Sequence, residues 1–152
     1  MMESPIRNIR ISASGRDQLI RLKRFTGIQH WNVICRWALC RSLAEPTPPS
    51  PAPLGEMSNI EMSWPVFAGP LGEVFMLAMR QRLLDDQLGT DDEVLTAQFR
   101  LHLHRGIAYL AGENVRKIDG LVERALEAMA TQRSLPFESE DPVPADADPR
   151  DP

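Results

Sequence analysis

The 152-residue sequence lacks several features that would define its class directly. No apolar run approaches the ~20 residues of a membrane-spanning helix, so we do not expect the chain to cross a membrane. The N-terminal stretch MMESPIRNIRIS has no secretory hydrophobic region, and we therefore expect a cytoplasmic protein. The sequence also contains no glycine-rich phosphate-binding loop and no nucleophile with a recognisable partner. We therefore predict no catalytic residue and no enzymatic activity.

Cysteine and histidine are scarce. Cys35 and Cys40 are five residues apart, which places them about 140° apart around a helix, and the chain has no other cysteine. We expect neither a disulfide nor a zinc site, and interpret both as core thiols. His102 and His104 are two residues apart, so they diverge by about 200° on a helix and cannot share an ion from it. We predict a structural or surface role for both, and no metal or other cofactor.

The net charge of -4 is unevenly distributed. Residues 1–45 carry eight basic and three acidic side chains, whereas six acids from Glu138 onward face only Arg150. This asymmetry suggests nucleic-acid contact at one end and an acidic tail at the other. Residues 134–152 combine prolines and acids with no apolar face, which predicts disorder.

The spacing of apolar residues predicts an all-α fold, with a short N-terminal strand followed by about five helices in one domain over residues 1–133. We expect a basic strand–helix–helix part (6–45), a stiff proline-rich arm (46–65) in which 59–64 can be extended, and a three-helix part (70–133). The predicted strand is 6–12. The first two predicted helices are 14–26, with Ser14 as cap and Leu19, Leu22 and Phe25 facing inward, and 26–45. The third is 71–88, with Arg82 in solvent and an inward face that consists of Leu71, Val74, Phe75, Ala78 and Met79. The last two are about 91–110, with a capping box at Thr90, and 114–133.

The predicted helix 26–45 is apolar on nearly every side and carries Trp31 and Trp37. Such a helix has to be buried, either in a core or between subunits. On the preceding helix, Ile20 lies among basic side chains, where a monomer gains nothing from it. We therefore predict an oligomer interface that includes Ile20, Trp31 and Trp37.

A basic cluster in the first 24 residues is the main functional candidate. Cations on one face neutralise DNA phosphates and release counterions, although a solvated helix face would have the same composition. The strand–helix–helix order resembles a ribbon-helix-helix module, in which paired strands from two subunits enter the major groove. In that module Asn8, Arg10 and Ser12 would point at bases. The predicted DNA-binding residues are Arg7, Arg10, Arg16, Arg21, Lys23 and Arg24.

Three unusual motifs resemble a known family. They are WNVICRWALCRSLAEPTPPSP (31–51), EMSWPVFAG (61–69) and FRLHLHRGIAYLAG (99–112). In this order and spacing they resemble the DNA sulfur modification protein DndE family, and the resemblance runs from about Ile6 to Leu121.

The resemblance implies a small helical subunit of the bacterial machinery that replaces a non-bridging phosphate oxygen of DNA with sulfur. In that machinery the chemistry resides in other subunits, namely a cysteine desulfurase, an iron-sulfur protein and an ATPase. The resemblance also implies a homotetramer that binds double-stranded DNA, notably nicked duplex, through a central positive surface containing lysines. This sequence has only two lysines, Lys23 and Lys117. We match Lys23 to that surface and expect arginines to supply the rest.

Two alternative functions are compatible with the residues. A free-standing ribbon-helix-helix repressor would bind one operator far better than random DNA. A metal-dependent nicking enzyme would use the acids of Asp85-Asp86 and Asp91-Asp92-Glu93, although capping of helix ends already explains these carboxylates.

Overall fold

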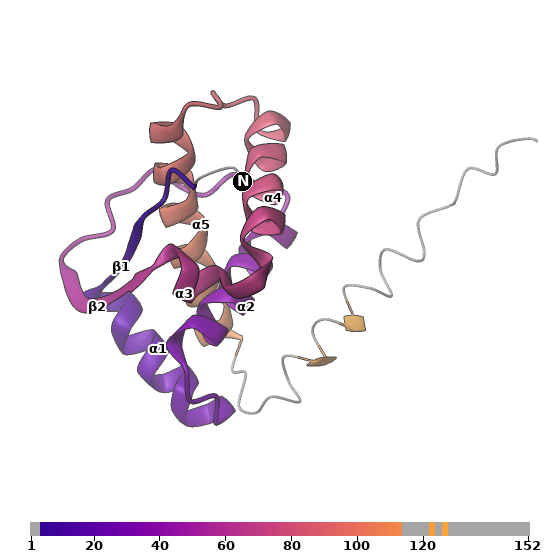
Figure 1. The fold of residues 1–152 in the computed structure, drawn as a ribbon. Coiled ribbons are helices and arrows are strands. Elements are labelled where there is room, and N and C mark those ends of the chain that lie inside the picture. Colours follow the sequence, from indigo (N-terminus) through magenta and orange to yellow (C-terminus); the bar gives the residue numbers. More distant parts are fainter. Residues whose placement is uncertain (1–3, 114–121, 124–125, 128–152) are drawn as a thin grey trace, which may run out of the picture.

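The structure is a computed structural model that describes residues 4–113, 122–123 and 126–127. In chain order its elements are β1 (Asn8–Ser12), α1 (Ala13–Thr26), α2 (Trp31–Ala44), β2 (Met57–Ser63), α3 (Trp64–Ala68), the 3-10 turn η1 (Gly69–Leu71), α4 (Gly72–Asp85) and α5 (Asp92–Gly112), as shown in Figure 1. The mainly helical class with a short N-terminal strand is confirmed. The helix predicted over 114–133 and the acidic tail fall almost entirely outside the described residues.

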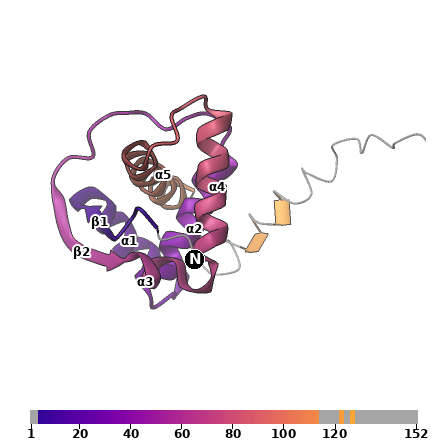
Figure 2. The ribbon, with the colours of Figure 1, turned by 45° about the horizontal axis from the view of Figure 1, so that its top comes forward.

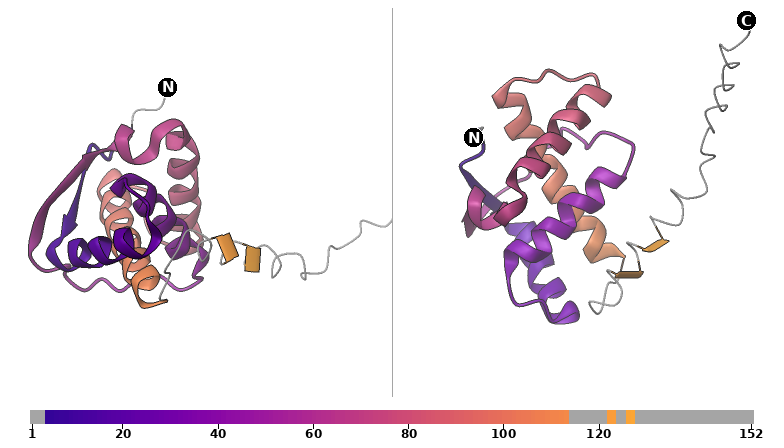
Figure 3. Two further views of the ribbon diagram at one scale, coloured as in Figure 1. Left: turned by 90° about the horizontal axis from the view of Figure 1, so that it is seen from below. Right: turned by 45° about the vertical axis from the view of Figure 1, so that its right-hand side comes forward.

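Helices α2 and α5 form the centre of the fold, and Figure 3 shows them crossing. The inner side of α2 is fully buried and consists of Ile34, Cys35, Ala38, Leu39 and Ser42. At the crossing α5 contributes Gly106, where a Cβ would overlap the backbone of Ala38. The predicted burial of this helix is confirmed, but its cover is α5 of the same chain. Cys40 is on the outer side and exposed, so its interpretation as a core thiol was wrong.

Strand β1 pairs with β2 in a two-stranded antiparallel sheet, with Ile9 opposite Met62 and Asn8 opposite Ser63. The predicted strand and the extended segment after the prolines are both confirmed. The pairing differs from a ribbon-helix-helix module, in which a second subunit supplies the partner strand. Here the proline-rich connection returns the same chain to β1, so both strands of the pair belong to one molecule.

Two helix starts differ from the prediction in the residue that occupies the N-cap position. Ser12, not Ser14, is the N-cap of α1, and its Oγ accepts the Gly15 N–H at 3.0 Å. The N-cap of α5 is Asp91, without a side-chain cap bond, so the predicted capping box at Thr90 is not formed. Gly27 ends α1 in the left-handed region with φ of 75°, as predicted.

Helix α4 lies along the outside of the fold, to the right of α5 in Figures 1 and 2. Phe75 and Met79 are buried as predicted. Leu71 and Val74, predicted to face inward, are exposed. Met76, Arg82 and Leu83 are buried in their place, since the ring cluster of Trp64, Phe67 and Phe99 packs against the side of α4 that carries Phe75. No helix in the described part of the chain is long and apolar enough to cross a membrane.

Candidate nucleic-acid interface

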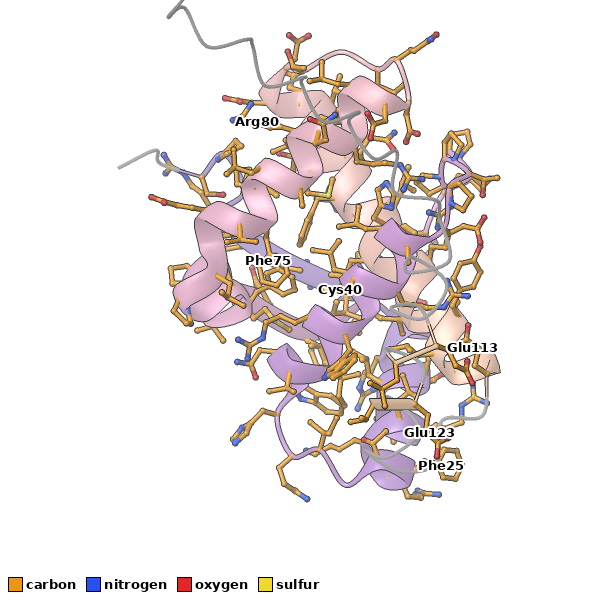
Figure 4. All side chains as sticks on the ribbon, turned by 90° about the vertical axis from the view of Figure 1, so that its right-hand side faces the viewer. Phe25, Cys40, Phe75, Arg80, Glu113 and Glu123 are labelled. Atoms are coloured by element: carbon orange, nitrogen blue, oxygen red, sulfur yellow. The ribbon has the colours of Figure 1, made fainter. Side chains whose placement is uncertain are left out.

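The outer face of α1 carries the densest group of basic side chains. Leu19 and Leu22 are buried against the core, which turns Arg16, Arg21 and Arg24 outward, and all three are exposed. Phe25, predicted to share the apolar arc, is instead 46% exposed at the end of the helix, where the chain turns away at Gly27. In Figure 4 it lies at the lower end of the molecule. The predicted basic outer face of α1 is present.

Lys23 has a different environment from its neighbours. It is half-buried, and its Nζ lies 4.6 Å from the ring centroid of Trp31, in a cation–π contact. This contact restrains the lysine and orients its charge toward the start of α2. The contact could not be predicted from the sequence, because the two residues belong to different helices.

Strand β1 places a second group of polar side chains next to α1. Ile9 and Ile11 point inward, while Asn8 and Arg10 are exposed. The Nε of Arg10 donates to the carbonyl oxygen of Ser58 at 3.0 Å, which leaves the two terminal nitrogens for another acceptor. Ser12 is buried in its role as helix cap, so the prediction that it points at bases was wrong.

The six cations of residues 7–24 form no ion pair within the described part of the chain. The ion pairs found there join Arg41 to Glu113 at 2.7 Å and Arg82 to Asp86 at 2.9 Å. Neither pair includes a residue of the group that we name the basic surface. Its members are Arg7, Arg10, Arg16, Arg21, Lys23 and Arg24, from the first 24 residues of the chain. Five of these cations come from two consecutive elements that adjoin in Figure 1, β1 with Arg10 and α1 with Arg16, Arg21, Lys23 and Arg24, and Arg7 directly precedes β1.

A buried histidine fixes the junction between those two elements. The backbone N–H of Ser12 donates to Nε2 of His104 at 3.0 Å, and Nδ1 of the same ring bonds the carbonyl oxygen of Arg100 at 2.8 Å. Burial lowers the pKa of His104, so the ring is neutral and can accept from Ser12. His104 thus acts structurally, as predicted, by holding the β1–α1 corner against α5.

A second polar cluster fixes the end of α2. The guanidinium of buried Arg82 donates to the carbonyl oxygens of Leu43, Glu45 and Thr47 at 2.7–3.0 Å, so its predicted exposure was wrong. Arg105 donates to Ser42 and Thr47 in the same turn. These bonds stabilise the start of the proline-rich connection that carries the chain back to β2.

His102 belongs to this second cluster. Its Nδ1 lies 2.8 Å from Ser42 Oγ, and the side chain has no exposed surface. Burial and the neighbouring charges of Arg105 and Arg82 lower its pKa to about 4. His102 and His104 therefore bond to different neighbours, α2 and β1, and do not converge.

The acidic residues considered for metal binding are dispersed or already engaged. Asp86 accepts from Arg82, and Asp85 accepts from Gln81 at 2.9 Å. Within residues 4–113 and the two short described pairs beyond, no group of three or more histidine, cysteine or acidic side chains is placed to hold a metal ion.

The residues of the predicted oligomer interface are all half-buried. Ile20 is on α1, and Trp31 and Trp37 are on α2, where both indoles pack partly against the core. Their role in assembly stays a prediction.

These features define a class of small helical proteins with an N-terminal strand pair and a basic strand–helix surface. The family model described as DNA sulphur modification protein DndE matches residues 8–117, and the chain belongs to that family. It is similar to a crystal structure of DndE from Escherichia coli B7A, a protein involved in DNA phosphorothioation modification. The similarity has a TM-score of 0.54 and 25% sequence identity, and covers 72% of this chain and 99% of that one. No curated protein sequence matches this chain.

Proposed function

We propose that this chain is a non-catalytic, DNA-binding subunit of a DNA sulfur modification complex. Its membership of the DndE family supports a role in DNA phosphorothioation, in which the E. coli relative is involved. The observation that carries the DNA-binding part is the basic surface, which the described residues leave without ion pairs. The chemistry of sulfur transfer would then reside in other subunits of the complex.

The geometry of α1 suits a nucleic-acid backbone. From Arg16 to Arg24 the helix rises about 12 Å, and this length of duplex carries about seven phosphate charges. Arginine binds phosphate in a bidentate manner, so the small number of lysines does not weaken this mode of binding. Contacts of this kind depend little on base sequence. We therefore propose binding to duplex DNA in general, including nicked duplex, by a homotetramer of this chain.

Removal of two cations from α1 tests the proposal. We expect the double variant Arg16→Gln with Arg24→Gln to lose roughly 5-fold in duplex affinity per phosphate contact at 0.15 M salt, or ~30-fold in total. The matched control is Gln87→Glu with Thr90→Glu, which changes the net charge equally in the exposed α4–α5 loop, at the opposite end of the molecule from α1 (Figure 1).

Fluorescence anisotropy with intact, nicked and random duplexes gives the affinities. Equal losses in the α1 variant and in the control would show that net charge alone matters, and would remove the assignment of the basic surface. A preference for one operator over random duplex by several orders of magnitude would favour a repressor. Plasmid relaxation that requires Mg²⁺ and disappears on substitution of Asp91 and Asp92 would favour a nicking enzyme.

A further inference from the structure

Large exposed apolar side chains are concentrated in one stretch of the chain. Eight are found in the described part of the chain, and five of them come from α3, η1 and α4: Val66, Leu71, Val74, Leu77 and Leu84, with exposed fractions of 46–62%. Figure 4 shows the side of the molecule on which α4 lies, with Phe75 and Arg80 labelled along it. Exposed apolar residues that are contiguous, rather than scattered, indicate an interaction surface.

The apolar residues of α4 have the spacing of a helix pair. Val74, Leu77, Gln81 and Leu84 follow one another at intervals of three, four and three residues, which is the seam of a coiled coil. The opposite side of α4 is already used, because Phe75, Met79 and Leu83 are buried in the core. In an isolated monomer this seam would only expose apolar side chains to water, whereas a second helix packed against it would bury them.

The charges beside the seam identify the second helix. Glu73 and Arg80 are seven residues apart, which separates them by about 10.5 Å along one face, too far to pair with each other. Within the described residues neither forms an ion pair, and Nε of Arg80 is buried without a hydrogen-bond partner. An antiparallel copy of α4 would bring Glu73 of the partner subunit to Arg80, and the reverse, so that a two-fold axis satisfies both charges twice.

A cavity lies beside the same stretch of helix. It has a volume of about 380 Å³ and is lined by Ser4, Trp64, Gly72, Glu73, Met76, Leu77 and Arg80. Trp64 is only 8% exposed and adds an aromatic wall to the cavity. An apolar side chain from a helix laid across α4 can enter this space, as anchor residues do at protein interfaces.

We propose that α4 pairs with α4 of a second copy of this chain, antiparallel, about a two-fold axis near residues 76–77. The inference rests on the self-association included in the proposed function, and assigns the surface that makes it. In Figures 1 and 2, α4 is on the right, whereas β1 and α1, the elements that carry most of the basic surface, are on the left, so pairing through α4 does not use these two elements. A tetramer with dihedral symmetry needs a second interface, for which the indoles of Trp31 and Trp37 remain candidates.

A charge-swap experiment tests the register directly. In Glu73→Arg and in Arg80→Glu, each homodimer would face two like-charged pairs, whereas a mixture of the two variants would form two attractive pairs. We expect each single variant to self-associate at least 10-fold more weakly than wild type, and the equimolar mixture to recover wild-type association. The double variant E73R/R80E should also recover. The control is Glu93→Arg, another exposed glutamate in the first turn of a helix, which should associate normally.

Sedimentation velocity of the full chain gives the masses, and circular dichroism checks folding. Recovery in the mixture supports the pairing. Single variants that associate like wild type, a mixture that does not recover, or a wild-type chain that is monomeric at high micromolar concentration would each overturn it. DNA affinity is measured on the same samples, so that a wild-type chain that is monomeric and still binds duplex DNA refutes the pairing but not the proposed DNA binding.

A second variant tests the apolar seam. Leu77→Asp puts a charge at the centre of the proposed contact, and should reduce the assembly to half its mass or to the monomer. The comparison is Phe25→Asp, which changes an apolar side chain that is 46% exposed on α1, away from α4. Dissociation by Phe25→Asp with no change in Leu77→Asp would contradict the assignment to α4.

Discussion

Substitution of Gly106 by alanine should destabilise the protein more than its small size suggests. Gly106 is inside α5, where it is fully buried against α2. A Cβ at this position would overlap the carbonyl group of Ala38 and lie 3.0 Å from its Cα. Because these are backbone atoms, no change of rotamer relieves the overlap. The two central helices would have to move apart.

The size of the effect follows from what the helices share. Alanine is favoured over glycine in a helix by about 1 kcal/mol, so the substitution begins with a small gain. Overpacking of a core costs about 1–3 kcal/mol when side chains can adjust, and more when backbone has to move. The separation of α2 and α5 also loosens the contacts of Ile34, Ala38 and Leu39. We expect a net loss of at least ~3 kcal/mol in the free energy of unfolding, a large part of the stability of a typical domain.

Urea denaturation followed by circular dichroism, at one fixed protein concentration, measures the change. The matched control is Gly112→Ala at the end of the same helix, where nothing lies within 4 Å of the new methyl group and stability should be unchanged or up to ~1 kcal/mol higher. Ala38→Gly should fail to rescue the variant, because the overlap involves backbone. A Gly106→Ala protein within 1 kcal/mol of wild type, or a full rescue by Ala38→Gly, would contradict a backbone overlap between α5 and α2.

Three further predictions follow from the buried groups. The folded pKa of His102, about 4, is below its ordinary value of 6.5, so the unfolded chain takes up this proton first as the pH falls. Stability should therefore drop by up to about 3 kcal/mol between pH 6.5 and 4 and then level off, and His102→Gln should flatten this slope in urea titrations at several pH values. Arg82→Lys should lower the free energy of unfolding by about 3 kcal/mol in the same assay, because one ammonium cannot reach all three carbonyl oxygens and Asp86. A variant as stable as wild type would show that these bonds are dispensable. A thiol reagent should modify one cysteine per native chain, Cys40, whose side chain is exposed. Partial desolvation by the surrounding protein still raises the pKa of this thiol, so the rate should increase up to a higher pH than for an ordinary thiol. Cys35 is fully buried with a pKa raised to about 12 and should react only after unfolding, so rapid labelling of both thiols would contradict the placement of α2.

The elements with strong local signals were predictable from the sequence. The alternation of Ile9 and Ile11 identified β1, and Gly27 marked the end of α1. The apolar character of residues 31–44 correctly indicated a buried helix. Each of these signals comes from a residue and its near neighbours in the chain, which sequence patterns report well.

The errors arose where distant parts of the chain meet. Arg82 is charged and was assigned to solvent. It is buried instead, because its guanidinium donates to three carbonyl oxygens of residues that lie almost forty positions earlier in the chain. The partner strand of β1 could not be identified, because alternation specifies a strand but not its neighbour. Val74 was assigned to the core from its spacing, but α4 is apolar on two sides and spacing alone does not show which side faces inward. In the candidate site, the same limitation hid the contact of Lys23 with Trp31 and the bond from Ser12 to His104.

The most direct test of the account is the salt dependence of duplex binding. We predict that the logarithm of the binding constant falls linearly with the logarithm of salt concentration, with a slope near -0.9 for each phosphate contacted, and that the slope becomes about 2 less steep when Arg16 and Arg24 are both replaced by glutamine. Similar slopes for intact and random duplexes agree with contacts to the DNA backbone. A slope near zero for the wild-type chain, or one that the two replacements leave unchanged, would contradict the claim that the basic surface of β1 and α1 binds DNA.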